Sequence, residues 1–250
     1  MANPDYIFGI RAVIEAIDAG KEIHRIMVKR DLKGDLATEL FNALKGRSVP
    51  LQKVPVERLN RITRKNHQGV VAWISEVVYH DIETIIPGLY EAGKTPFILV
   101  LDGVTDVRNF GAIARTAECA GVDAILVPSK GSAVINADAI KTSAGALHKI
   151  PVCRTTNLLK SLQFLKGSGL KLLGASEKGD TVFNATQMDV PLAIVMGSED
   201  TGLSAETLRI CDYLVSIPMQ GTVSSLNVSV AAGILIFEVV KQRMPAQMNR

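Results

Sequence analysis

Three stretches rich in glycine, hydroxyl and amide groups carry the side chains of this sequence that are best suited to chemistry. They are DGVTDVRNFGAIARTAECAG from residue 102, GSEDTGLS from residue 197 and QGTVSSLNVS from residue 220. The first holds Asn109 near a predicted helix start and Arg115 six residues further on. The second holds Glu199, an acid placed to accept hydrogen bonds from hydroxyls or amines. The third holds Ser225 and Asn227.

Each stretch on its own also has an ordinary structural explanation. The first could be an N-capped helix with an exposed arginine, and the second a glycine turn before a helix capped by Ser204. In the third, Ser224 or Ser225 could cap a helix that runs to about Arg243. That cap leaves Asn227 and Ser229 of the first turn unexplained. Since none of the stretches has the GxGxxG or Walker A pattern, standard dinucleotide and nucleoside triphosphate sites are disfavoured.

The strands that precede these stretches predict a parallel α/β sheet. Short apolar runs without alternation are typical of strands buried on both faces, and helices fit between them. Because ligands bind at the carboxyl ends of such strands, we expect the three stretches to converge on one pocket. The predicted strands are 97–101, 124–127, 151–154, 171–174, 193–196 and 213–217, and the predicted helices include 111–120, 137–144, 158–165 and 205–210.

A smaller α/β module is predicted over residues 1–76. Its first helix spans Ile7–Ala19 and stops at Gly20. Strands at 23–28, 50–54 and 70–74 alternate with helices at 35–44 and 56–62. Residues 77–96 are predicted as a linker with one short helix that Pro87 limits. The larger domain then covers residues 97–250.

Basic charge is concentrated in the small module. Residues 1–75 hold 13 Lys and Arg against eight Asp and Glu, although the whole chain has a net charge of only +3. The loop RITRKNHQG suits contacts with phosphates and base edges of RNA through Arg61, Arg64, Lys65 and His67. A solvated surface loop is the alternative for this segment taken alone.

Composition excludes several other classes of protein. Four histidines and three cysteines show no ligand spacing, so we expect neither a metal site nor a disulfide. The first residues do not resemble a signal peptide, and no apolar run reaches the length of a membrane span. We therefore expect a cytoplasmic protein.

The segments NFGAIAR, MGSEDTGLS and IPMQGTVSSLNVSVA resemble the three motifs of the SpoU (TrmH) family of RNA ribose 2′-O-methyltransferases. IFGIRAVIEAI, HQGVVA and LDGVTDVRNFGAIART extend the resemblance to the branch that methylates a guanosine in large-subunit ribosomal RNA. The resemblance implies a SPOUT domain, which is a knotted parallel α/β domain with a deep trefoil, preceded by an L30e-like RNA-binding domain. It also implies a homodimer and bound S-adenosylmethionine.

The resemblance also implies roles for individual residues. S-adenosylmethionine would lie against the backbone of three residues, with two more nearby; the five are Gly197, Ile217, Leu226, Met219 and Gly202. Arg115 would be nearest the reacting hydroxyl, with Ser225 lining the site and Asn109, Glu199 and Asn227 orienting Arg115 and the ribose. Since a guanidinium is not expected to deprotonate, Arg115 could instead grip an RNA phosphate while a phosphate oxygen or water takes the proton.

Three other functions stay open at this point. A transfer-RNA ribose methyltransferase of the same family is the nearest, although such enzymes more often lack the N-terminal module. A catalytically silent RNA-binding relative is disfavoured by the intact polar residues, and another nucleotide-dependent enzyme by the missing glycine patterns.

The apolar helix from about Ser225 to Arg243 should be buried on more than one side, which a two-fold partner would achieve.

Overall fold

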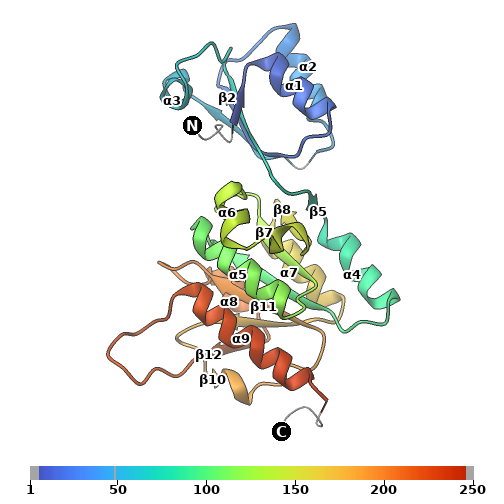
Figure 1. Cartoon of the computed structure of the whole chain (residues 1–250), viewed down its shortest axis with the longest axis vertical. Coiled ribbons are helices and arrows are strands. Elements are labelled where there is room, and N and C mark those ends of the chain that lie inside the picture. Colours follow the sequence, from blue (N-terminus) through green and yellow to red (C-terminus); the bar gives the residue numbers. More distant parts are fainter. Residues whose placement is uncertain (1–5, 48, 246–250) are drawn as a thin grey trace. The chain divides into compact units, whose positions relative to one another are not determined.

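The computed structural model describes residues 6–47 and 49–245, which form two compact units that divide between Val78 and Tyr79 (Figure 1). The first unit also includes residues 134–136. The predicted domain ranges begin at residue 1 and end at residue 250, and their outermost parts, 1–5 and 246–250, lie outside the described residues.

The first unit is a four-stranded sheet with the order β1-β4-β2-β3. Strands β2 and β3 are parallel and the other pairs are antiparallel. Helices α1 and α2 pack on one face and α3 on the other, each over its own cluster of apolar residues. The elements are β1 (Tyr6–Phe8), α1 (Ile10–Asp18), β2 (Ile23–Lys29), α2 (Asp35–Ala43), β3 (Leu51–Val54), α3 (Val56–Ile62) and β4 (Val70–Ile74).

The start of this unit corrects the sequence prediction. A helix was expected from Ile7, but Tyr6–Phe8 forms a strand that pairs with β4. Gly9 then turns the chain with φ of 92°, a conformation that a helix cannot contain and that glycine adopts without strain. The helix therefore begins only at Ile10.

The second unit is an eight-stranded sheet, parallel throughout, with the order β10-β12-β9-β11-β6-β7-β8-β5 (Figure 1). The six predicted strands are confirmed, with ends shifted by one residue. They are β6 (Phe97–Asp102), β7 (Ala124–Pro128), β8 (Val152–Thr155), β9 (Lys171–Ala175), β11 (Leu192–Gly197) and β12 (Tyr213–Ser216). Two strands of two residues each, β5 (Tyr79–His80) and β10 (Thr181–Val182), were not predicted and extend the sheet at its edges.

Helices cover both faces of this sheet. They are α4 (Ile82–Glu91), α5 (Val107–Cys119), α6 (Ala137–Thr142), α7 (Leu158–Gly167), α8 (Ala205–Ile210) and α9 (Val228–Arg243). Helix α5 contacts both α6 and α9. A Cβ atom at Gly111 would lie 2.7 Å from Cβ of Thr142, so glycine allows α5 and α6 to approach each other closely.

The segment predicted as a linker, residues 77–96, is largely built into the second unit. Strand β5 pairs with β8, and Ile82 and Ile86 of α4 are buried in the apolar core between the sheet and the helices on one of its faces. Pro87 lies inside α4 instead of ending it. Burial of Ile82 and Ile86 offsets the hydrogen bond that the proline removes.

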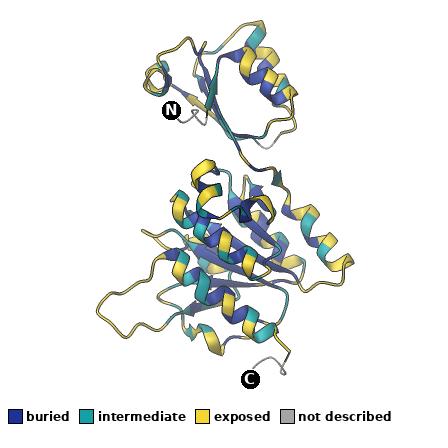
Figure 2. Ribbon diagram, in the orientation of Figure 1, coloured by how far each residue is buried: buried dark blue, intermediate teal, exposed yellow. Residues whose placement is uncertain are grey.

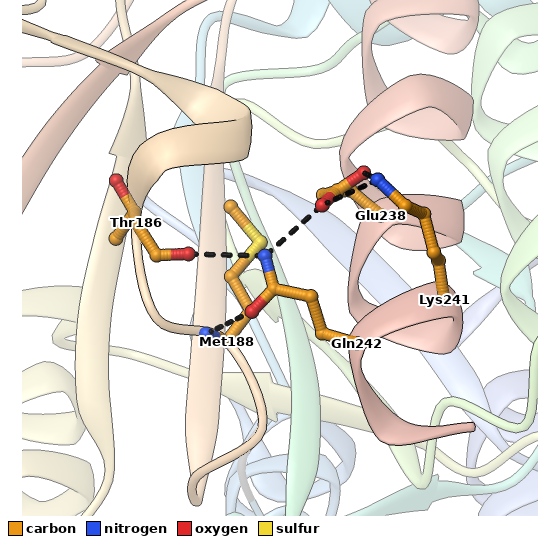
Figure 3. A network of polar contacts seen from close by, with 5 residues as sticks. All are labelled: Thr186, Met188, Glu238, Lys241 and Gln242. Carbon is orange, nitrogen blue, oxygen red and sulfur yellow. Dashed lines mark hydrogen bonds and ion pairs between the residues drawn. The ribbon is translucent and has the colours of Figure 1, made fainter. Parts of the chain in front are cut away.

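The C-terminal end of α9 is fastened to the segment before β11 by polar side chains (Figure 3). The amide of Gln242 accepts a hydrogen bond from Met188 N at 2.8 Å and donates to Thr186 O and to Glu238. Arg243 donates to four main-chain carbonyls, those of Thr95, Pro96, Met188 and Val190. These bonds fix one end of the helix whose other end reaches the candidate site.

Candidate active site

The carboxyl ends of neighbouring strands meet at one edge of the eight-stranded sheet, where they border a cavity of about 820 Å³. Gly197 at the end of β11 lies opposite Asp102 at the end of β6. The walls come from the segments that follow β9, β11 and β12 and from the start of α9. The volume lies within the range of sites that enclose a small molecule or cofactor.

A tight hairpin after β11 forms one wall of the cavity. Ser198 and Gly202 exchange two main-chain hydrogen bonds of 3.0 and 2.9 Å, and the Ser198 and Thr201 hydroxyls lie 2.7 Å apart. A Cβ atom at Gly197 would overlap main-chain atoms of Gly202 and Leu203, so only glycine fits there. The conformation of this hairpin is therefore fixed by its own residues.

The base of the hairpin is tied to β6 and to α8. Ser204 caps α8 by accepting a hydrogen bond from Thr207 N, as the sequence predicts. The carboxylate of Asp102 accepts hydrogen bonds from the Thr207 hydroxyl at 2.7 Å and from Ser204 N at 3.3 Å. Asp102 was not singled out from the sequence, and the residues it holds lie more than 100 positions away along the chain.

A chain of side-chain hydrogen bonds connects all three polar stretches. Asn109, in the first turn of α5, donates through Nδ2 to Glu199 on the hairpin. Its Oδ1 atom accepts a hydrogen bond of 3.1 Å from Nδ2 of Asn227. Asn227 Oδ1 in turn accepts from both the backbone and the hydroxyl of Ser229. The amide of Asn109 therefore holds together a carboxylate and an amide that the sequence separates by 28 residues.

The start of α9 differs from the prediction. The helix was expected from about Ser225 with a serine cap, but it begins at Val228 and its N-cap residue is Asn227. The Asn227 side chain satisfies Ser229 N while its own amide group reaches Asn109. One residue thus caps the helix and joins it to α5, which accounts for the two polar residues that a serine cap left unexplained.

Most of the predicted site residues border the cavity. All five residues assigned to the cofactor line it, together with three of the five assigned to catalysis: Gly197, Gly202, Ile217, Met219, Leu226, Glu199, Ser225 and Asn227. Asn109 reaches the same place through its hydrogen bonds to Glu199 and Asn227. Arg115 lies two turns further along α5 with an exposed side chain, and it forms no hydrogen bond or ion pair within the described part of the chain.

One wall of the cavity was missed from the sequence. The segment after β9 contributes Ser176, Glu177 and Lys178 to the lining. Its sequence, ASEKGD, is a run of small and polar residues directly after a buried strand, which is the signal that identified the other three stretches.

In the first unit, the loop 61–69 separates the predicted RNA-binding residues into two kinds. Arg61, Arg64 and Lys65 are exposed, as a contact with RNA requires. His67 is instead 7% exposed, with Nε2 at 2.8 Å from Asn60 Oδ1 and Nδ1 accepting from Gly69 N. The direct RNA contact predicted for His67 is therefore replaced by a structural role, because both ring nitrogens are used to shape the loop.

Other predicted features can be located within residues 6–47 and 49–245. Cys153 is buried, Cys211 is half-buried and Cys119 is exposed, and all three are free thiols. The described residues contain no cluster of His, Cys, Asp and Glu that could hold a metal ion. Among the helices of this part of the chain, none has the length and apolar character required to cross a membrane.

Fold and site together define a class: a parallel α/β domain with a ligand cavity at its strand ends, joined to a basic α/β module. The family model described as the SpoU rRNA Methylase family matches residues 96–237. A second model, described as RNA 2′-O ribose methyltransferase substrate binding, matches residues 6–79. The chain belongs to the SpoU family of RNA ribose 2′-O-methyltransferases, which confirms the resemblance of its three polar motifs.

Relatives match along nearly the whole chain. A protein of Bacillus subtilis strain 168, named as a TrmH family tRNA/rRNA methyltransferase, is 34% identical over 96% of this chain and 97% of its own length. The SpoU methyltransferase AviRb from Streptomyces viridochromogenes, solved in complex with the cofactor AdoMet, is 26% identical with a TM-score of 0.60. That match covers 95% of this chain and 90% of AviRb.

A shorter neighbour matches only part of the chain. The A. aeolicus TrmH/SpoU tRNA modifying enzyme is 29% identical with a TM-score of 0.55, and the match covers 64% of this chain and 83% of that enzyme. The match therefore leaves about a third of the present chain without a counterpart in that enzyme.

Proposed function

We propose that this protein transfers a methyl group from S-adenosylmethionine to the ribose 2′-hydroxyl of a guanosine in large-subunit ribosomal RNA. The observation that carries the proposal is the hydrogen-bond chain from Glu199 through Asn109 to Asn227 beside the 820 Å³ cavity. It gathers, at the strand ends of a SpoU-family sheet, the polar groups needed to orient a hydroxyl. The protein would act in the cytoplasm, where it would meet this RNA.

The cavity suits S-adenosylmethionine in size and in chemistry. Its lining offers main-chain groups at Gly197, Gly202 and Ile217 and apolar contacts from Met219 and Leu226. Glu177 adds a carboxylate that can accept hydrogen bonds from ribose hydroxyls or from an amine. When bound, the cofactor supplies an electrophilic methyl carbon, and the residues around it hold the acceptor hydroxyl in line with that carbon.

The polar residues of the site would orient the acceptor ribose. The amide of Asn109 is locked between Glu199 and Asn227, so the directions in which these two side chains can bond are set before RNA arrives. Ser225 lines the cavity with an exposed hydroxyl beside them. A group positioned in advance in this way lowers the barrier without reorganising during the reaction.

Arg115 would act on the RNA and not on the cofactor. Its guanidinium is exposed and unpaired within the described residues, so it is available to bind a phosphate with two parallel hydrogen bonds. The proton of the 2′-hydroxyl would then pass to a phosphate oxygen or a water molecule, because a guanidinium stays protonated at ordinary pH. Arg115→Ala should lower methylation by about a hundredfold or more while leaving cofactor affinity unchanged.

Ribosomal RNA is favoured over transfer RNA by the first unit. This unit matches a substrate-binding family model over residues 6–79 and carries the excess of basic charge. The tRNA modifying enzyme from A. aeolicus matches only 64% of the chain, which is what is expected if that enzyme lacks a counterpart of the first unit. A transfer-RNA substrate remains the second candidate because the B. subtilis relative is named for both RNAs.

A homodimer is proposed from the surface of α9. Val230 and Phe237 of this helix are 50% and 51% exposed, and the partly buried Ile234 lies between them at helical spacing. The other side of α9 packs on α5 and β11, so the strip has no cover within the described residues. A two-fold partner would cover it and would place the loop after β12 close to the interface. The trefoil knot of the family is proposed for this same C-terminal segment.

The decisive experiment maps 2′-O-methyl groups in ribosomal and transfer RNA from cells with and without the gene. We expect one guanosine in large-subunit RNA to lose its methyl group, and purified protein with labelled S-adenosylmethionine to restore it. Loss at a transfer-RNA position instead would support the second candidate, and no change in either RNA would reject the proposed activity.

The dimer is tested by Phe237→Lys with Val182→Lys as its control. Both residues are exposed hydrophobics, at 51% and 39%, but Val182 lies on the edge strand β10 and not on α9. Sedimentation at micromolar concentration should show a dimer for the wild type and for the control, and a monomer or aggregate for Phe237→Lys. A wild-type monomer that still methylates RNA would reject the dimer.

A further inference from the structure

The face of the first unit's sheet that carries α3 also carries a group of aromatic rings and cations. The register places Tyr6 and Arg25 on either side of Trp73, in one row across β1, β4 and β2. Phe8, Val71 and Met27 form the next row. The four residues Tyr6, Phe8, Arg25 and Trp73 are all partly exposed, and we call them the aromatic face.

The rings of the aromatic face form a continuous surface. The ring of Tyr6 lies 6.1 Å from that of Trp73 and 6.4 Å from that of Phe8, with tilts of 51° and 49° between the ring planes. Helix α3 covers the neighbouring apolar residues, and the Tyr6 hydroxyl donates to Ile62 O at its end. The rings are therefore held in place from beneath and from one side, which keeps a stacking surface rigid.

Cations lie directly over two of these rings. The Arg25 guanidinium is 4.1 Å from the centre of the Trp73 ring, and Lys65 Nζ is 5.8 Å from that of Phe8. Burial lowers the pKa of Arg25, and the nearby Arg58 guanidinium lowers it further by repulsion. The charged neighbour that shifts this pKa is thus itself a cation, although a partly buried guanidinium is most stable beside an anion.

Arg25 itself lacks a polar partner. Its Nε atom is buried and unbonded, and none of the residues that the structure describes forms a hydrogen bond or ion pair with its guanidinium. Buried donors in native proteins are normally satisfied, so an unsatisfied one beside an open surface indicates a ligand that supplies the acceptor. Such a ligand must be anionic and must tolerate contact with aromatic rings.

Unpaired RNA meets both requirements, because its phosphates are anionic and its bases stack on aromatic rings and on guanidinium planes. We propose that the aromatic face binds unpaired nucleotides of the substrate RNA, with a base stacked beside Arg25 and Trp73 and a phosphate against Arg25 and Arg58. This inference rests on the proposed RNA substrate. It adds a second contact surface to the basic loop at residues 61–69.

The sequence offers a direct spectroscopic test, because Trp73 is its only tryptophan. A single-stranded oligouridylate added to the full-length protein should quench the Trp73 emission in a saturable way. A duplex RNA of equal length should leave the emission nearly unchanged, since its bases are already stacked on one another. Binding of both RNAs is followed independently by the anisotropy of a dye on the RNA.

Variants separate stacking from general charge. Arg25→Gln should weaken the binding of oligouridylate by about tenfold and reduce the quenching. Lys45→Gln is the matched control, since Lys45 is exposed just beyond α2 and loses the same charge, with an expected change of less than about twofold. Arg25→Lys, which keeps the charge without the planar group, should fall between them. Circular dichroism verifies that each variant is folded, and calorimetric binding of S-adenosylmethionine verifies that the second unit is intact.

The outcomes distinguish this inference from the proposed function. If oligouridylate binds without quenching Trp73, or if Arg25→Gln and Lys45→Gln bind it equally, the aromatic face is not the binding surface. The proposed methyl transfer to RNA would still stand in that case. If the wild-type protein binds S-adenosylmethionine but no RNA of any kind, the proposed function fails as well. Absence of quenching by any single-stranded RNA would reject RNA as the occupant of the aromatic face.

Discussion

Two segments that border the same cavity are built in opposite ways. The hairpin that follows β11 is closed by main-chain bonds between Ser198 and Gly202 and tied to β6 through Asp102. In the loop that follows β12, residues from Pro218 to Leu226 are all exposed and form no hydrogen bond within the described part of the chain. This loop projects from the second unit and appears as exposed along its length (Figure 2).

The difference shows which contacts fix the conformation of each wall of the cavity. The hairpin is held by its own chain, so Glu199 is positioned before any ligand binds. The loop obtains a fixed point only at Asn227, where Asn109 and the start of α9 hold it. The contacts missing from Pro218–Leu226 would be supplied by the cofactor and by a second protomer. Binding would then order one wall of the cavity and leave the other unchanged.

The largest effect is expected from a methyl group added to the hairpin. Gly197→Ala places a Cβ atom into the backbone of Gly202 and Leu203, and such overpacking costs about 1–3 kcal/mol or more. Calorimetry should show the affinity for S-adenosylmethionine reduced by up to about a hundredfold. Gly221→Ala in the loop is the control: nothing lies within 4 Å of its Cβ position, so affinity should be retained. Equal losses in the two variants would contradict the comparison.

An effect of similar size, but on methylation alone, is expected at the residue that joins the two walls. Asn109→Asp replaces the amide that donates to Glu199 by a carboxylate that repels it, and Asn109→Ala removes both bonds. Methylation should fall by about a hundredfold in either variant. Cofactor affinity should change little, because Asn109 does not line the cavity. Arg108→Ala, an exposed neighbour on α5, should behave as the wild type in both assays.

How far the sequence predicts this fold depends on the length of each element. Buried strands of four or more residues were located correctly because a continuous apolar run is itself the signal. β1, β5 and β10 were missed, since segments such as YH and TV carry no periodicity and become strands only by pairing with a neighbour. The helix was expected from Ile7 because apolar residues with helical spacing also occur before Gly9. The spacing does not reveal that Gly9 has a positive φ, so that the helix begins only after it.

The candidate site was predictable where family motifs and strand ends coincide, and not where distant contacts decide. Asn227 was expected inside a helix, and its position as the N-cap follows from a bond to Asn109, 118 residues away. His67 was predicted to contact RNA together with its basic neighbours, whereas its ring is buried and bonded to Asn60 and to Gly69. A sequence shows which residues are polar, but only packing determines whether they face solvent or the interior.

Hydrogen exchange should show the contrast between the two walls directly. The amides of Ser198 and Gly202 are bonded to each other and should exchange slowly in the free protein. Amides between Pro218 and Leu226 should exchange at nearly the rate of an unstructured chain, and S-adenosylmethionine should slow them by about tenfold or more. Chymotrypsin cleavage after Leu226 should be suppressed in parallel. If the amides of the loop after β12 are already protected from exchange without ligand, the two walls do not differ in the proposed way.

The smallest effect is expected at the base of the hairpin, where Cys211 serves as a built-in reporter. Its sulfur and the Leu203 side chain both pack against Gly174, at 3.0 and 2.9 Å from the position of a Cβ atom there. Burial, with a smaller contribution from the Asp212 carboxylate, raises the pKa of the Cys211 thiol to about 11. The reactive thiolate is therefore only about one part in a thousand at pH 8.

Alkylation of Cys211 by iodoacetamide should consequently be slow at pH 8 and should accelerate about tenfold for each unit of pH up to about 10. Cys119, which is exposed, should react first and calibrates the reagent, whereas burial raises the pKa of Cys153 to about 12 and should keep it the least reactive. Because the hairpin is already closed, S-adenosylmethionine should change the Cys211 rate by less than about twofold. Strong protection of Cys211 by the cofactor would mean that the hairpin, like the loop after β12, is ordered by ligand.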